Sequence, residues 1–200
     1  MNNEKTIVTA LGDSLTFGYM VSEKNKWVNL INSRSHALAV INRGINGDTT
    51  GGMLERFDRD VDKNSKILTI WGGANDFYYD EMSAEAVFEN IKKIAAKAQA
   101  IGIYPAAVIN TELNYEKHGF FTIDEAILSA MSKKLYKLGT LLKQSDMATI
   151  DVKSAFNSEA GSKKSEYFFD EAHFNDKGSM LVADIMEKAL EKIRAEKNLY

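Results

Sequence analysis

The sequence predicts an α/β fold in which helices cover both faces of a parallel β-sheet. Strand-like apolar runs alternate with helix-like segments through all 200 residues. The strand-like runs are almost continuously apolar, which is typical of strands buried on both faces. Strands separated by helices imply right-handed crossovers, and such crossovers make neighbouring strands parallel. No repeat, linker or low-complexity tract interrupts the chain, so we expect one domain over residues 1–200.

Five short apolar runs, several of them rich in β-branched residues, are the predicted strands. They cover residues 6–11, 37–41, 66–71, 103–109 and 147–152. Pro105 lies early in the fourth run. Because proline cannot donate a hydrogen bond to a neighbouring strand, this position favours an edge strand or the start of a strand.

The predicted helices carry apolar residues at three- and four-residue spacing. They cover residues 22–34, 50–62, 83–101, 122–142 and 176–195. Thr122 and Glu125 have the spacing of a capping box, which predicts that the fourth helix begins at Thr122. The segments 77–82, 110–121 and 157–169 are expected to be irregular loops.

Composition and charge exclude several classes of function. The net charge is −3 and there is no long basic run, so nucleic acid is not an expected partner. The chain contains no cysteine and only three histidines, His36, His118 and His173, which lack zinc-binding spacing; we therefore expect no metal. Neither glycine-rich nucleotide-binding motif occurs.

The N-terminus is polar, and the apolar run that follows it is too short and too strand-like for a signal peptide. No segment contains eighteen consecutive apolar residues, so no membrane span is expected. The expected location is therefore the cytoplasm.

Polar blocks follow four of the predicted strand ends, where ligands bind in sheets of this kind. Ser14 follows the first strand, Gly47 lies in a glycine-rich turn after the second, and Asn75 follows the third. Asp170 and His173 stand beyond the fifth strand, at the entrance to the last helix. Together the blocks supply the groups that catalyse acyl transfer: a hydroxyl, free N–H groups, an amide and an Asp–His pair.

Each of these groups would have its own role in the reaction. His173 would take the proton of the Ser14 hydroxyl, and Asp170 would orient the imidazole. The N–H groups of Ser14 and Gly47 and the amide of Asn75 would stabilise an oxyanion. No cofactor is needed. Simpler interpretations are a turn serine, a structural histidine, an asparagine that caps a turn, and a glycine required only by its backbone conformation.

Other polar and aromatic residues have less specific interpretations. We expect Asp13 and Asp76 to make local hydrogen bonds in turns. His36 and His118 are expected to be exposed or structural. Aromatic residues at 77–79, 120–121 and 167–169 flank the polar blocks, where they would either line a pocket or pack the loops onto the domain.

These blocks resemble those of the GDSL, or SGNH, hydrolase family. The resemblance rests on Gly12-Asp13-Ser14-Leu15, on Gly47, on Gly73-Ala74-Asn75-Asp76, and on Asp170-Glu171-Ala172-His173. It is specific because all four blocks occur in order, each after a predicted strand. It implies a three-layer, flavodoxin-like fold with strand order 2-1-3-4-5, a Ser14/Asp170/His173 triad, and an oxyanion hole of Ser14, Gly47 and Asn75.

The resemblance also implies hydrolysis of small-molecule esters or thioesters. The segment from Asn42 to Gly47 looks like the version found in bacterial lysophospholipase, arylesterase and acetylhydrolase members. One alternative is a carbohydrate O-acetyl esterase that uses the same residues in a more polar pocket. An alternative of another class is a non-catalytic binding domain that retains the fold. The acyl chain, the leaving group and the oligomeric state stay open at this point.

Overall fold

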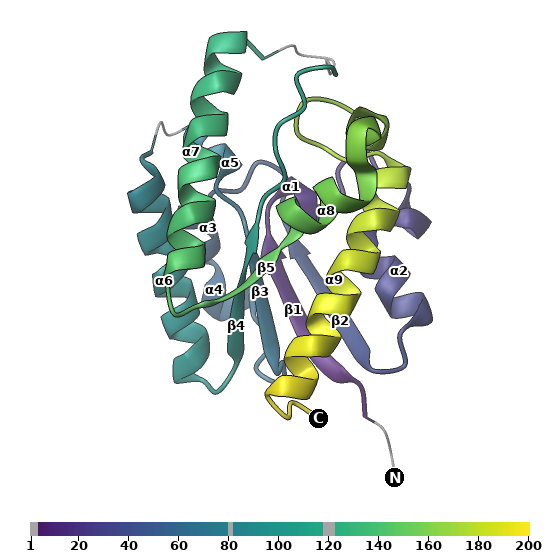
Figure 1. Ribbon diagram of the computed structural model, residues 1–200. Helices are drawn as coiled ribbons and strands as arrows, with labels where there is room; N and C mark the ends of the chain where they lie inside the picture. Colours follow the sequence, from purple (N-terminus) through teal and green to yellow (C-terminus); the bar gives the residue numbers. More distant parts are fainter. Residues whose placement is uncertain (1–3, 80–81, 118–122) are drawn as a thin grey trace.

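A five-stranded parallel sheet forms the centre of the computed structural model, which describes residues 4–79, 82–117 and 123–200 (Figure 1). Its order is β2-β1-β3-β4-β5, and each neighbouring pair is parallel. The strands are β1 (Thr6–Gly12), β2 (Leu38–Gly44), β3 (Ile67–Trp71), β4 (Tyr104–Ile109) and β5 (Ala148–Asp151). The predicted α/β fold and strand order are confirmed.

Helices cover both faces of this sheet (Figure 1). On one face lie α2 (Trp27–Arg34), α8 (Val152–Ala160) and α9 (Asp176–Glu196); on the other lie α3 (Thr50–Glu55), α4 (Phe57–Asp60), α6 (Ala84–Ala100) and α7 (Glu125–Gln144). Four short elements complete the described chain: α1 (Ser14–Phe17), the 3-10 helix η1 (Glu23–Asn25), α5 (Ala74–Tyr78) and the 3-10 helix η2 (Gly161–Tyr167).

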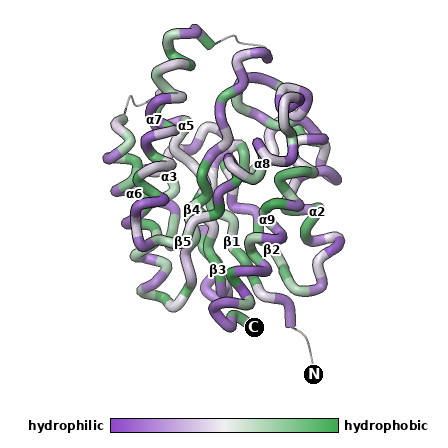
Figure 2. The backbone as a smooth tube through the Cα atoms, in the orientation of Figure 1, coloured by the Kyte–Doolittle hydropathy of each residue, from purple (hydrophilic) through white to green (hydrophobic). Residues whose placement is uncertain are grey.

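Strand β3 explains why the strand sequences are continuously apolar. Ile67 and Trp71 pack into the core beneath α2 and α9, whereas Leu68 and Ile70 pack into the core beneath α6 and α7. Successive side chains of a strand point to opposite faces, so a strand covered on both sides needs apolar residues throughout. Figure 2 shows hydrophobic residues along these central strands.

Two predicted helices are shorter in the structure than in the prediction. The helix expected over residues 22–34 begins at Trp27 and is preceded by η1. The helix expected over residues 50–62 divides into α3 and α4, with Arg56 between them. Arg56 is buried, and its side chain reaches back to the end of β1.

The predicted start of the helix expected over residues 122–142, which is α7 in the structure, was wrong. Asp124 is the N-cap of α7, and its carboxylate accepts from the Ala126 amide at 2.8 Å. Aspartate caps strongly and its charge complements the helix N-terminus, so it takes the position expected for Thr122. Thr122 itself lies outside the described residues.

The expected loop over residues 157–169 was also wrong, since it contains the end of α8 and all of η2. Pro105 is the second residue of β4, as a strand-start position requires, although β4 is an interior strand. Pairing with β5 begins only at Ala106, so the missing N–H does not interrupt that ladder. Within the described ranges, no helix combines the length and apolar character needed to cross a membrane.

Candidate active site

Ser14 is the first residue of α1, directly beyond the carboxyl end of β1. Asp13 caps this short helix by accepting from the Leu15 amide at 2.9 Å, which is the local hydrogen bond expected for it. At the other end, Gly18 has a φ of +81° and donates its N–H to the Ser14 carbonyl at 2.9 Å. The Ser14 hydroxyl is thus held on a tight turn at the edge of the sheet.

His173 and Asp170 lie on a tight turn between η2 and α9. The Asp170 carboxylate accepts from the backbone amides of Ala172 and His173 at 2.9 and 2.7 Å. The Phe169 amide donates to the His173 carbonyl at 2.8 Å, and Phe168 and Phe174 pair as an antiparallel bridge. These bonds close the turn and bring the side chains of Asp170 and His173 to the same side.

Ser14, His173 and Asp170 form one chain of hydrogen bonds. Ser14 Oγ lies 2.9 Å from His173 Nε2, although the two residues are 159 positions apart in sequence. On the far side of the ring, His173 Nδ1 lies 2.8 and 3.0 Å from the two carboxylate oxygens of Asp170. This geometry favours the tautomer in which Nδ1 carries the proton and Nε2 accepts from the serine.

Asp170 is suited to orient an imidazole at neutral pH. Burial raises the pKa of its carboxyl, but the hydrogen bonds from His173 and from the two backbone amides outweigh burial and leave the pKa below its ordinary value. The carboxylate therefore stays ionised. The side chains of His173 and Asp170 are 24% and 12% exposed, so the pair is mostly buried but still reached by solvent.

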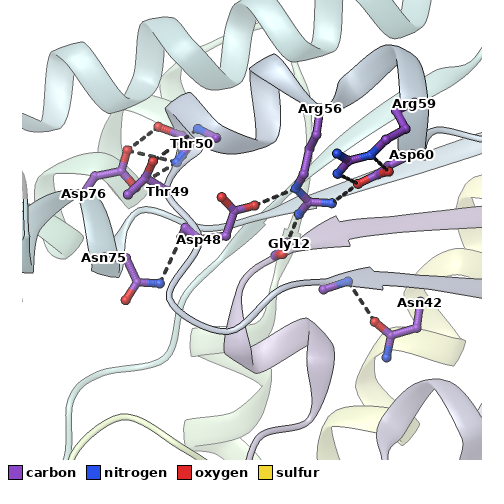
Figure 3. A network of polar contacts seen from close by, with 12 residues as sticks. Gly12, Asn42, Asp48, Thr49, Thr50, Arg56, Arg59, Asp60, Asn75 and Asp76 are labelled. Atoms are coloured by element: carbon purple, nitrogen blue, oxygen red, sulfur yellow. Dashed lines mark hydrogen bonds and ion pairs between the residues drawn. The ribbon is translucent and has the colours of Figure 1, made fainter.

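The loops after β2 and β3 meet beside the end of β1. The Ile45 amide donates to the Gly12 carbonyl at 3.0 Å, and Gly47 adopts a φ of +76° in the turn that follows. Asn75, in α5, points its amide at this turn and donates to the Asp48 carbonyl at 2.9 Å (Figure 3). Gly47 and Asn75 therefore lie on neighbouring segments at the carboxyl edge of the sheet.

A buried polar network supports these loops (Figure 3). Arg56 bonds to Asp48, Asp60 and the Gly12 carbonyl. The expectation that Asp76 makes local turn bonds was incomplete: its carboxylate accepts from the Thr50 amide at 3.0 Å and from the Thr50 hydroxyl, 26 positions away. Sequence reasoning missed Arg56, although Asp60 four residues further on is a readable helical ion-pair signal.

Aromatic residues near the site differ in burial. Phe77 and Phe168 are buried in the two cores and so pack the loops onto the fold. Tyr78 and Tyr79 are exposed. Tyr19, which the sequence did not single out, places its ring 4.7 Å from the imidazole of His173. The predicted aromatic pair at 120–121 lies outside the described residues.

The remaining candidate features lie away from Ser14. His36 is exposed before the amino end of β2, and His118 lies outside the described residues. In the part of the chain that the structure describes, no three metal-ligating side chains are grouped to hold an ion. A cavity of about 810 Å³ lies between the loop after β4, α7 and α8, and none of Ser14, Asp170 and His173 lines it.

The sheet topology and the Ser14–His173–Asp170 geometry are those of an α/β protein with a serine–histidine–aspartate constellation at the carboxyl edge of its sheet. A model of the GDSL-like lipase/acylhydrolase family matches residues 10–181. The chain belongs to this family, and the resemblance found in the sequence blocks is confirmed.

One protein is similar to this chain in sequence, and two solved structures share its fold. The chain is 37% identical to an arylesterase from Vibrio mimicus over 79 residues, which are 37% of this chain and 38% of that protein. A lipolytic G-D-S-L family member from Veillonella parvula is 18% identical with a TM-score of 0.74, over 92% of this chain and 97% of the other. An acetyl xylan esterase is 21% identical with a TM-score of 0.69, over 92% and 99%.

Proposed function

We propose that the protein is a serine hydrolase that cleaves carboxylic esters or thioesters through an acyl-Ser14 intermediate. The observation that carries this proposal is the continuous hydrogen-bonded chain from Ser14 Oγ through the His173 ring to the Asp170 carboxylate. Membership of the GDSL-like lipase/acylhydrolase family supports the same reaction class. A serine hydroxyl is activated when it is hydrogen-bonded to a base that is itself oriented by a carboxylate.

In the first half of the reaction, Ser14 Oγ attacks the substrate carbonyl carbon while His173 Nε2 takes the hydroxyl proton. Asp170 stabilises the imidazolium that forms. The tetrahedral intermediate then collapses, the bond from the carbonyl carbon to the leaving oxygen or sulfur breaks, and His173 gives its proton to the leaving group. In the second half, water attacks the acyl-serine by the same route and restores the Ser14 hydroxyl.

The oxyanion of the tetrahedral intermediate needs fixed hydrogen-bond donors. We assign these to the backbone N–H groups of Ser14 and Gly47 and to the side-chain amide of Asn75. An amide nitrogen carries two hydrogens. One of those on Asn75 is used by the Asp48 carbonyl, which leaves the second for the substrate.

The proposal is tested with p-nitrophenyl esters of increasing chain length, assayed beside acetylated xylose and lysophospholipid. Wild-type protein should release p-nitrophenol, and Ser14→Ala should lower kcat by about 10³-fold or more. Asp170→Asn should cause a comparable loss, since it disturbs the tautomer of His173. Ser33→Ala, which changes an exposed helix serine of α2, serves as the matched control and should keep wild-type kcat.

Equal hydrolysis by wild-type and Ser14→Ala protein would contradict the proposal. Absence of hydrolysis of every ester by folded wild-type protein would favour the non-catalytic binding domain. The substrate with the highest kcat/KM identifies the acyl chain and the leaving group, and a preference for acetylated xylose would establish the carbohydrate O-acetyl esterase.

A further inference from the structure

Arg56 is a buried cation whose donors point in three directions. Its side chain is 6% exposed. Nε donates to Asp48 at 2.7 Å, Nη1 donates to Asp60 at 2.8 Å, and Nη2 donates to the Gly12 carbonyl at 3.0 Å. A planar guanidinium can serve three acceptors at fixed angles, whereas the single ammonium of lysine cannot reproduce that geometry.

These contacts lead to all three segments that carry the proposed oxyanion donors (Figure 3). Gly12 is two residues before Ser14, and Asp48 directly follows Gly47. The carbonyl of the same Asp48 accepts from the Asn75 amide at 2.9 Å. One side chain thus connects the nucleophile turn to the Gly47 turn, and through Asp48 to Asn75.

The carboxylate of Asp48 has little freedom to move. A Cβ added to Gly52 would lie 2.2 Å from Asp48 Oδ1, so the carboxylate is packed directly against the first turn of α3. Burial raises the pKa of Asp48, and the contact with Arg56 opposes that rise. Removing the guanidinium would leave a carboxylate that is only 11% exposed without its counter-ion, next to the turn that carries Gly47.

We propose that Arg56 is a positioning residue of the oxyanion hole, an inference that rests on the proposed function. Arg56 touches no reacting atom. Its effect passes through the Gly12 carbonyl and Asp48, which set where the Ser14, Gly47 and Asn75 donors stand relative to one another. Oxyanion donors act only if they are aligned before the reaction, and a displacement of about 1 Å costs up to about 100-fold in rate.

The test is the steady-state kinetics of Arg56→Lys with a p-nitrophenyl ester. We expect kcat to fall by about 10- to 100-fold, with KM changed by less than about threefold, because the oxyanion forms only after binding. The matched control is Arg59→Lys. Arg59 bonds to the same Asp60, but its side chain is 70% exposed and does not reach Gly12 or Asp48, so kcat should be unchanged.

A purely structural role is separated by combining Arg56→Lys with Asn75→Ala. If Arg56 acts through the hole, the double variant should lose less kcat than the product of the two single losses. Should Arg56→Lys fail to fold, Asp48→Asn is the second variant, since it keeps the carbonyl that Asn75 uses but removes the ion pair. It should show the same selective loss of kcat.

Wild-type kcat in both Arg56→Lys and Asp48→Asn would overturn this inference, as would strict multiplication of the Arg56→Lys and Asn75→Ala losses. Ser14→Ala, assayed in parallel, distinguishes failure of the Arg56 inference from failure of the proposed serine mechanism. Loss of activity in Ser14→Ala together with full activity in both Arg56→Lys and Asp48→Asn removes the positioning role alone. Full activity in Ser14→Ala removes the serine mechanism itself.

Discussion

At the residue scale, the proposed mechanism gives two hydrogen bonds to the single side-chain amide of Asn75. One hydrogen of its Nδ2 goes to the Asp48 carbonyl, and the second is assigned to the oxyanion. Replacement by alanine should therefore lower kcat by about 10²- to 10³-fold, the usual effect of removing one oxyanion donor. The measurement is kcat on a p-nitrophenyl ester, with the exposed Asn64→Ala as control. Unchanged kcat in Asn75→Ala would remove this residue from the hole.

Asp13, next to the proposed nucleophile Ser14, illustrates how burial of a carboxyl group affects stability. Burial raises the pKa of Asp13 to about 7, while the Leu15 amide and the charge of His173 oppose that rise. In the unfolded chain the pKa is about 3.9. Between these two values the unfolded state releases the proton and the folded state retains it, so the folded protein loses stability as the pH rises.

Asp13→Asn cannot titrate, yet its side-chain oxygen can still cap α1. The variant should therefore gain stability over wild type between pH ~4 and pH ~7, by up to a few kcal/mol, with no further gain at higher pH. Urea denaturation across this pH range measures the difference in unfolding free energy. A difference that is the same at every pH would show that Asp13 titrates normally in the folded protein.

At the scale of elements, α3 is anchored at its first residue by a buried carboxylate. Thr50 is fully buried, and both its amide and its hydroxyl donate to Asp76 of α5. Thr50→Val keeps the shape of the side chain but removes the hydroxyl that donates to the buried Asp76 carboxyl and accepts from the Asn90 amide. It should lower the unfolding free energy by about 1–3 kcal/mol.

Thr140→Val is the control for that substitution, because the Thr140 hydroxyl donates only to a backbone carbonyl one turn earlier in α7. Chemical denaturation should show a change below about 0.5 kcal/mol for this variant. Equal effects of the two substitutions would contradict a special role for the Thr50–Asp76 contact.

Element length decided which helices the sequence could predict. Helices α6, α7 and α9 repeat their apolar positions over several turns, and their predicted bounds were correct within a few residues. Helices α1 and α5 contain only four and five residues. A single turn has no period to detect, so both appeared in the sequence only as polar blocks after strands.

At the scale of the whole molecule, the site depends on the packing of η2 against the start of α9. Gly178 makes this approach close: an added Cβ would lie 2.1 Å from the Tyr167 carbonyl and 3.0 Å from the Phe174 side chain. Gly178→Ala should force these segments apart, lower the unfolding free energy by about 1–3 kcal/mol and reduce kcat by shifting His173.

Gly51→Ala provides the comparison for Gly178→Ala, since a Cβ there meets only Thr49 Oγ1 at 3.6 Å. Alanine is the better helix former, so this variant should be as stable as wild type or slightly more stable. Thermal denaturation and kcat are the two measurements. A Gly178→Ala protein with wild-type values of both would show that the η2–α9 approach is not needed.

The candidate site was predictable where a reactive or polar residue type directly follows a strand. Ser14 and Asn75 lie just beyond β1 and β3, and parallel strands bring such ends to one edge. Asp170 and His173 follow η2 instead of a strand, and the sequence indicated them as an Asp–His pair before the last helix. Arg56, the Thr50–Asp76 contact and the Tyr19–His173 packing were missed. They depend on side chains that reach from one element to another. Local sequence patterns do not show which elements lie side by side in the fold.

Labelling with a fluorophosphonate probe tests the central claim most directly, because the reaction replaces fluoride by a bond from phosphorus to the activated serine oxygen. Peptide mass spectrometry should locate the label on Ser14, with no label in Ser14→Ala and much slower labelling in His173→Ala. Folded wild-type protein that stays unlabelled, or that carries the label on another serine, would contradict the serine mechanism.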